Sequence, residues 1–198
     1  MNTTVYSDIR EVKKYAIDNN VPIMQDDGID FLTSFIVKNQ INSVLEIGTA
    51  IGYSAIMMAL ANPNLKITTI ERDNDRYLEA IKNIKKFQLE DRITLVFSDA
   101  LDINIEGLFD MIFIDAAKGQ NIRFFEKYET NLKPHGYIIT DNMNFHGLVD
   151  KADALIESRN LRSLVRKIRD YRTFLLNNSN YAVELLNIGD GVAVAEKK

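Results

Sequence analysis

Two short segments of the sequence combine carboxylate, amide and amine side chains that could act on one substrate. Asp115 and Lys118 follow one apolar run, and Asp141 and Asn142 follow the next. Two carboxylates and an amide offer only oxygen donors, which suit Mg²⁺ or another divalent cation, with water or substrate filling the remaining positions. The competing interpretation is that Asp115 and Asp141 only cap the helices that follow them.

Lys118 is the candidate general base or charge-stabilising group beside this cation site. A lysine next to a divalent cation can act as a base toward a hydroxyl group. The alternative is a solvated lysine at the start of a helix, which is the usual environment of this residue type. His135 and His146 are assigned no catalytic role, although His146 lies in the loop after Asn142, where it could touch a substrate.

A glycine-containing loop, Glu-Ile-Gly-Thr-Ala-Ile-Gly-Tyr-Ser over residues 46–54, predicts a second kind of site. Gly48 and Gly52 allow a ligand to approach the backbone closely, and Glu71 can accept hydrogen bonds from ribose hydroxyls. A dinucleotide site prefers G-x-G-x-x-G, but Ala50 takes the middle position and Glu46 would repel a pyrophosphate. An acid suits the cationic amino-acid part of S-adenosylmethionine better. The alternative is a simple turn with a strand-end acid.

These residues require a scaffold of alternating strands and helices. Strands are predicted at 43–47, 66–70, 92–97, 109–114 and 136–140, helices at 5–19, 26–39, 53–62, 74–87, 119–131 and 154–175, and a hairpin at 181–188 and 192–196. This alternation predicts an α/β fold with a mostly parallel sheet, helices on both faces and an antiparallel C-terminal hairpin. Ligands bind outside the carboxyl ends of such strands, where Asp99 and Ala100 would contact an adenine.

Composition bounds the protein class. The chain has 198 residues, 26% of them charged and 9% aromatic. This composition argues against general disorder, and the length predicts one domain over 1–198. The absence of cysteine excludes a disulfide framework, a thiolate zinc site and a cysteine nucleophile. We find no signal-peptide pattern and no apolar run of about 18 residues, so we expect a cytoplasmic protein without a membrane partner.

Together, five segments resemble the cation-dependent O-methyltransferases that use S-adenosylmethionine, the group that includes the catechol and caffeoyl-CoA methyltransferases. The segments are VLEIGTAIGYSA (44–55), TIERD (69–73), FIDAAKGQ (113–120), IITDN (138–142) and IGDGVAVA (188–195), within a resemblance that covers roughly residues 20–198. The resemblance implies a Rossmann-like class I methyltransferase fold with a seven-stranded sheet.

The resemblance also implies a role for individual residues. Asp115, Asp141 and Asn142 would bind Mg²⁺ or another divalent cation, and Lys118 would be the catalytic lysine. The S-adenosylmethionine site would be lined by Met24, Glu46, Gly48, Ser54, Glu71, Asp99, Ala100 and Asp115. The two N-terminal helices (1–40) would cover the pocket, and because relatives are often homodimers, we expect a homodimer.

The acceptor is the open question within this family. The segments VPIM (21–24), LEIGTAIGYSAI (45–56), NIKKFQLEDRI (83–93) and NSNYAVELLNIGDG (178–191) are similar to the bacterial members that methylate 5-hydroxyuridine to 5-methoxyuridine at the wobble position of tRNA. A tRNA anticodon stem-loop is therefore the first predicted substrate. The loop Met143–Gly147 departs from the V-L-x-x-G that is common in relatives.

Local charge bears on the same question. The whole chain has a net charge of −4, but residues 151–172 carry seven basic and three acidic side chains. Arg159, Arg162, Arg166 and Arg169 follow helical spacing and could hold tRNA phosphates. A solvated helix or a helix at a subunit contact would show the same charge pattern in the sequence. The alternative function is a small-molecule methyltransferase of the catechol or caffeoyl-CoA type, and a nucleotide-binding module without chemistry is a third possibility.

Overall fold

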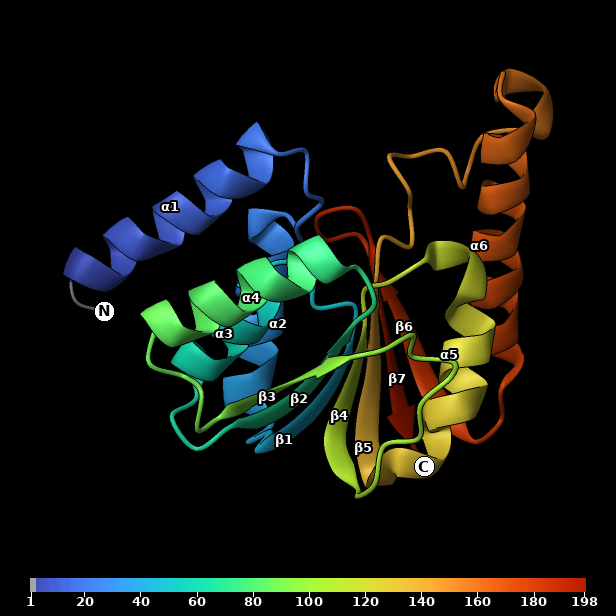
Figure 1. Ribbon diagram of the computed structural model, residues 1–198. Helices are drawn as coiled ribbons and strands as arrows, with labels where there is room; N and C mark the ends of the chain where they lie inside the picture. Colours follow the sequence, from blue (N-terminus) through green and yellow to red (C-terminus); the bar gives the residue numbers. More distant parts are fainter. Residues whose placement is uncertain (1–2) are drawn as a thin grey trace.

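A seven-stranded sheet with the order β3-β2-β1-β4-β5-β7-β6 runs through the middle of the protein (Figure 1). The computed structural model describes residues 3–198, so Met1 and Asn2 of the expected domain lie outside it. The strands are β1 (Ser43–Ile47), β2 (Lys66–Glu71), β3 (Ile93–Phe97), β4 (Phe109–Ile114), β5 (Leu132–Asp141), β6 (Tyr181–Leu186) and β7 (Val192–Lys197). β1 to β5 pair in parallel, and β7 pairs antiparallel with β5 and β6, which confirms the predicted fold class.

Helices cover both faces of the sheet (Figure 1). One face carries α1 (Thr3–Asp18), α2 (Asp26–Lys38), α3 (Tyr53–Ala61) and α4 (Asn74–Lys86), and the other carries α5 (Asn121–Tyr128) and α6 (Arg159–Asn177). Alternation along β4 feeds both cores: Met111 and Phe113 join the cluster under α1 to α4, whereas Ile112 and Ile114 join the one under α5 and α6. A central parallel strand is mostly apolar because both of its faces are buried, and the one acid of β4, Asp110, lies near its amino end.

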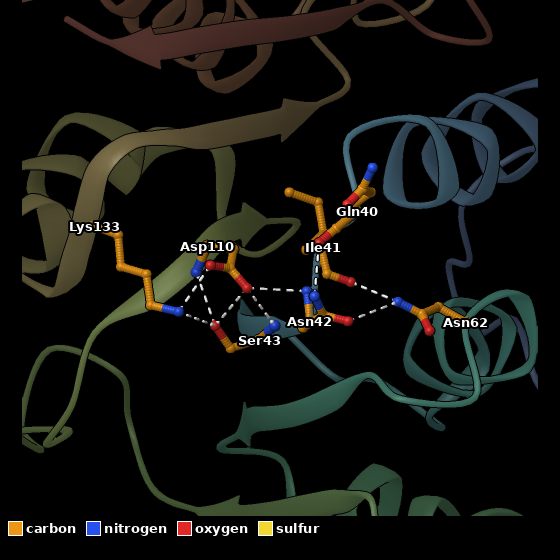
Figure 2. A network of polar contacts seen from close by, with 7 residues as sticks. All are labelled: Gln40, Ile41, Asn42, Ser43, Asn62, Asp110 and Lys133. Carbon is orange, nitrogen blue, oxygen red and sulfur yellow. Dashed lines mark hydrogen bonds and ion pairs between the residues drawn. The ribbon is translucent and has the colours of Figure 1, made fainter.

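A polar network ties together the amino ends of the central strands (Figure 2). The Asp110 carboxylate accepts hydrogen bonds from the backbone N–H of Asn42 at 2.9 Å and of Ser43 at 2.8 Å, and it pairs with Lys133 Nζ at 2.8 Å. Asn62, just after α3, donates to the carbonyl of Ile41 at 2.7 Å. The network therefore joins β1, β4, β5 and the end of α3 at the edge away from the strands' carboxyl ends.

The sequence misjudges the limits of three elements. The predicted helix 119–131 is divided into the 3-10 turns η1 (Lys118–Gln120) and η2 (Glu129–Asn131) with α5 between them, and β5 begins at Leu132 rather than at 136. Leu132 pairs with Phe109 and is buried, so tertiary burial extends the strand across Pro134. Similarly, α6 begins at Arg159, where the Ser158 hydroxyl caps it, after a short turn η3 (Asp153–Leu155).

Within the described part of the N-terminal segment, the linker between α1 and α2 supplies the residues that line the cleft at the carboxyl edge of the sheet. α1 lies against α4 and α2, where Lys86 pairs with Asp8 and Glu11. The linker residues Pro22 to Gln25 line the cleft described below, while α1 and α2 pack into the sheet core. No helix within residues 3–198 has the length and apolar character needed to cross a membrane.

Candidate active site

A cleft of about 580 Å³ opens at the carboxyl ends of the parallel strands. Strand order reverses between β1 and β4, and this is the point at which open α/β sheets bind ligands. The volume lies within the range of small-molecule sites. The cleft brings together most of the residues expected from the sequence, namely Met24, Gly48, Glu71, Asp99, Ala100, Asp115, Lys118, Asp141 and Asn142.

The glycine loop forms one wall through a backbone that other residues would not permit. Gly48 has φ +99°, and a Cβ at this position would lie 2.3 Å from the backbone oxygen of Asp115. Ala50, which stands where a dinucleotide motif has its middle glycine, also adopts a left-handed conformation with φ 48°. Its N–H donates to Glu71 Oε2 at 2.8 Å, so the acid at the end of β2 stabilises the strained loop.

Glu71 and Asp99 form an acidic end of the cleft. Besides Ala50, the Glu71 carboxylate binds the backbone N–H of Arg72 and of Asp73, at 2.9 and 2.8 Å. Asp99 accepts from the N–H of Leu101 and pairs with Arg72 at 3.0 Å, and these contacts lower the pKa of its carboxyl. Both acids are thus rigid acceptors at the position expected for a ribose and an adenine.

Glu46 and Ser54 are buried and are not among the described residues that line the cleft, so their expected contact with S-adenosylmethionine stays a prediction. Glu46 is fully buried, and its carboxylate accepts hydrogen bonds from the hydroxyls of Ser54 and Thr69, each at 2.5 Å. Burial raises the pKa of Glu46 to about 7, against the lowering effect of these two hydroxyls. Thr69, which in turn contacts Thr49, is a member of this network that sequence reasoning missed.

The opposite end of the cleft holds the second carboxylate cluster. Asp115 follows β4 and pairs with Lys118 Nζ at 2.5 Å, and both side chains are mostly buried. Asp141, the last residue of β5, is 3% exposed. Burial, together with the neighbouring charge of Asp115 and against the opposing charge of Lys118, raises the pKa of Asp141 to about 7.

This donor set fits a divalent cation. Asp115, Asp141 and Asn142 present carboxylate and amide oxygens in one cleft, and hard cations select such oxygens. A cation would also relieve the repulsion that raises the pKa of Asp141. Within residues 3–198 no cluster of three or more His, Cys, Asp or Glu side chains competes as a metal centre, so two carboxylates and one amide remain the candidate ligands.

Several cleft residues were missed by sequence reasoning. Asp190, Phe145, Phe124 and Arg76 all line the cleft. Asp190 belongs to the Gly189-Asp190-Gly191 segment, which the sequence pattern indicated only as a hairpin turn. An acid between two glycines in a segment that resembles the family was the available signal.

The arginine stripe of α6 contacts the chain's own loop. Arg169 donates to the carbonyl of Val149 and pairs with Asp153, and Arg166 pairs with the same carboxylate at 2.6 Å. Arg162 donates to the carbonyl of Glu157. None of the four arginines, Arg159 included, is among the described residues that line the cleft. Their predicted contact with tRNA phosphates stays a prediction.

Comparison with known proteins identifies the family. The model of the O-methyltransferase family matches residues 2–198. The chain belongs to the O-methyltransferase family. Among curated relatives of this O-methyltransferase, a caffeoyl-CoA O-methyltransferase of Populus kitakamiensis is 29% identical over 193 residues, covering 93% of this chain and 82% of the relative. A flavonoid 3',5'-methyltransferase of Vitis vinifera is 28% identical over 200 residues, covering 94% and 82%.

Solved structures of two bacterial proteins share the architecture. A Staphylococcus aureus structure, described as that of a candidate caffeoyl-CoA O-methyltransferase, is 37% identical with a TM-score of 0.90, covering 96% of this chain and 92% of that one. An O-methyltransferase of Bacillus cereus, solved in complex with SAH, is 27% identical with a TM-score of 0.84, covering 97% and 91%. These likenesses agree with the Rossmann-like sheet described above.

Proposed function

We propose that this O-methyltransferase moves a methyl group from S-adenosylmethionine to a hydroxyl group of a small aromatic molecule that carries a second oxygen on the adjacent carbon. The single observation that carries the proposal is the presence of two different acidic ends in one cleft. Glu71 and Asp99 lie at one end, and Asp115, Asp141 and Asn142 lie at the other with Lys118.

The acidic end at Glu71 supports S-adenosylmethionine as the methyl donor. A carboxylate after the second strand is suited to a ribose diol, and Asp99 and Ala100 follow the third strand, where an adenine would lie. Gly48 keeps the backbone accessible to the donor because it carries no side chain. The Bacillus cereus relative binds SAH, the product left when this donor loses its methyl group.

The other end supports a vicinal pair of oxygens in the acceptor. Asp115, Asp141 and Asn142 would hold a divalent cation, which when bound would stabilise negative charge on the acceptor oxygen. Lys118 Nζ, 2.5 Å from Asp115, can take the hydroxyl proton when it is neutral. The oxygen then forms a bond to the methyl carbon as the carbon–sulfur bond breaks, with the electron pair leaving on sulfur.

Two observations favour a small acceptor over tRNA. Arg162, Arg166 and Arg169 already donate to the loop at 149–157, so the stripe that would grip phosphates is engaged within the chain. The curated relatives carry names of small-molecule enzymes. The 5-hydroxyuridine of a tRNA anticodon stem-loop, which also has an oxygen beside its hydroxyl, stays the second candidate on the strength of the sequence resemblance.

One assay separates these possibilities. Purified protein is incubated with S-adenosylmethionine labelled in its methyl group, with Mg²⁺ or with a chelator, and with one of three acceptors. These are an ortho-dihydroxyphenyl acid, its monohydroxy analogue, and bulk tRNA containing 5-hydroxyuridine. We expect chelator-sensitive transfer to the dihydroxy acid alone. Transfer to tRNA but not to the dihydroxy acid would show that tRNA, and not a small molecule, is the substrate. Transfer that persists in the presence of the chelator would show that the reaction needs no divalent cation.

A further inference from the structure

We propose that Asp190 is a positioning residue that orients the Asn142 amide toward the cation and holds the loop 142–147 against the cleft. The inference rests on the proposed function, because it assigns Asn142 to the cation. Asp190 lies in the turn between β6 and β7, far in sequence from both the glycine loop and the carboxylates, and is only 7% exposed. Asp190 and Asn142 therefore meet only because the turn and the loop 142–147 pack against each other.

The two carboxylate oxygens of Asp190 have different partners on this loop. Oδ1 accepts a hydrogen bond from the backbone N–H of His146 at 2.5 Å. Oδ2 lies 3.4 Å from Nδ2 of Asn142 and accepts from it. An amide that gives its nitrogen to an acid presents its oxygen on the opposite arm, and the oxygen is the only arm that a cation can use. The contact therefore selects the orientation of Asn142 that suits a ligand.

The backbone around Asp190 fixes the same loop. The N–H of Met143 donates to the carbonyl of Gly191 at 2.9 Å, and that of Asn144 donates to the carbonyl of Asp190 at 2.8 Å. A Cβ on Gly191 would lie 2.6 Å from the side chain of Asn144, so the hairpin and the loop are in direct contact. The hairpin thus acts as a rigid support on which the loop is built.

The loop needs this support because its backbone is strained. Asn142, Phe145 and His146 have φ values of 60°, 44° and 55°, in the left-handed region that residues with side chains disfavour. Such conformations persist only where the surrounding structure enforces them, and they concentrate at functional sites. Phe145 and His146 also line the cleft on the acceptor side, so the loop that Asp190 holds forms part of the acceptor pocket.

The inference predicts that Asp190 acts through Asn142 and the loop rather than on the substrate. Outer partners that orient metal ligands typically change metal affinity by about 10- to 100-fold. Asp190→Ala should weaken cation binding by that amount and raise the acceptor KM. Asp190→Asn should separate the two effects: its amide oxygen can still accept from the His146 N–H, but its NH₂ group would face the Asn142 NH₂ group, so loop order is kept while cation affinity falls.

The test uses the full chain without S-adenosylmethionine or acceptor. Mn²⁺ binding is measured by electron paramagnetic resonance, and exchange of the His146 backbone amide with deuterium is measured on the same samples. The matched control is Asn187→Ala, because Asn187 also joins the hairpin to the loop, through a 2.8 Å hydrogen bond from Asn144, but no hydrogen bond joins it to Asn142 or His146. We expect weaker Mn²⁺ binding in both Asp190 variants, faster exchange in Asp190→Ala only, and wild-type values in Asn187→Ala.

Three different results would contradict either the role of Asp190 or the proposed function on which it rests. Wild-type Mn²⁺ affinity in both Asp190 variants would overturn the role of Asp190 in orienting Asn142. Unchanged His146 exchange in Asp190→Ala would overturn its role in holding the loop. A wild-type protein that binds no Mn²⁺ would contradict the proposed cation and the orientation of Asn142 for it, while His146 exchange would still decide the role in the loop.

Discussion

The two ends of the parallel strands treat their acids in opposite ways. At the amino ends, Asp110 is surrounded by the N–H groups of Asn42 and Ser43 and by Lys133 (Figure 2). Burial alone would raise the pKa of Asp110, but these donors outweigh it and bring the pKa below its ordinary value. At the carboxyl ends, burial and the neighbouring charge of Asp115 together raise the pKa of Asp141 to about 7.

This difference separates structural from functional acids. Asp110 joins three strands and has its hydrogen-bonding demand met within the chain, so its charge stabilises the fold. Asp141 is held beside another carboxylate in a cleft, which costs stability in the absence of a ligand. Acids with such perturbed pKa values in clefts mark functional sites, and a bound cation would remove the penalty. Variants at each end of the strands test whether structural and functional acids divide in this way.

The largest expected effect is on activity at the carboxyl end. Asp141→Asn should lower methyl transfer by more than about 100-fold, because even outer partners of metal ligands are worth 10- to 100-fold. The unfolding free energy measured without a cation should stay equal or rise, because a buried charge is removed. Rates with Mg²⁺ and denaturation curves without it are the measurements. A variant that is destabilised yet active would reverse the assignment of this end.

The second effect is on the pH dependence of stability and involves Glu46. Its folded pKa of about 7 lies above the ordinary value of 4.5. The folded state therefore binds more protons than the unfolded state between these pH values, and stability falls as pH rises from 4.5 to 7. The shift corresponds to about 3 kcal/mol at most. Glu46→Gln should flatten the curve of unfolding free energy against pH between 5 and 7.5, although the part due to Asp141 remains.

For Asp110, at the amino ends of the strands, the contribution to the unfolding free energy should rise with pH instead of falling. Because the pKa of Asp110 is lowered, its contribution is present above the unfolded pKa and is lost as pH falls through the folded value. Asp110→Ala should lower the unfolding free energy at pH 7 by about 1 kcal/mol, since it removes hydrogen bonds to the backbone N–H groups of the half-buried Ser43 and the exposed Asn42. Activity per folded molecule should be unchanged. A selective loss of activity would show that the amino end also takes part in function.

The smallest effect is expected outside both ends, at the exposed Arg159 of α6. Arg159→Glu should leave transfer to a small dihydroxy acid within about twofold of wild type, because surface charges contribute little where no partner is held. If tRNA is the substrate instead, the same change should weaken binding and reduce its salt dependence by about one phosphate contact. Initial rates on both acceptors at two salt concentrations decide between these outcomes.

Features that depend on neighbouring residues could be predicted from the sequence, whereas features that depend on contacts between distant residues could not. Apolar strand runs and the acids that end them are local patterns, so β1, β4 and the positions of Asp115 and Asp141 could be predicted. The extension of β5 to Leu132 could not, because it depends on pairing with Phe109. The arginines of α6 were recognised as a stripe, but their partners at 149–157 come from the folding of a loop.

The sequence by itself determined the chemistry available: carboxylate, amide and amine groups at strand ends, a glycine loop without the dinucleotide pattern, and no thiol. The tertiary structure decided which of these groups share a cleft. It buried Glu46 completely and gave its carboxylate two partners, Ser54 and Thr69, that come from two other elements. It also brought Asp190 to Asn142, because β7 pairs with β5 and carries the preceding turn to the end of that strand. Such convergence depends on strand order and packing, which no local pattern encodes.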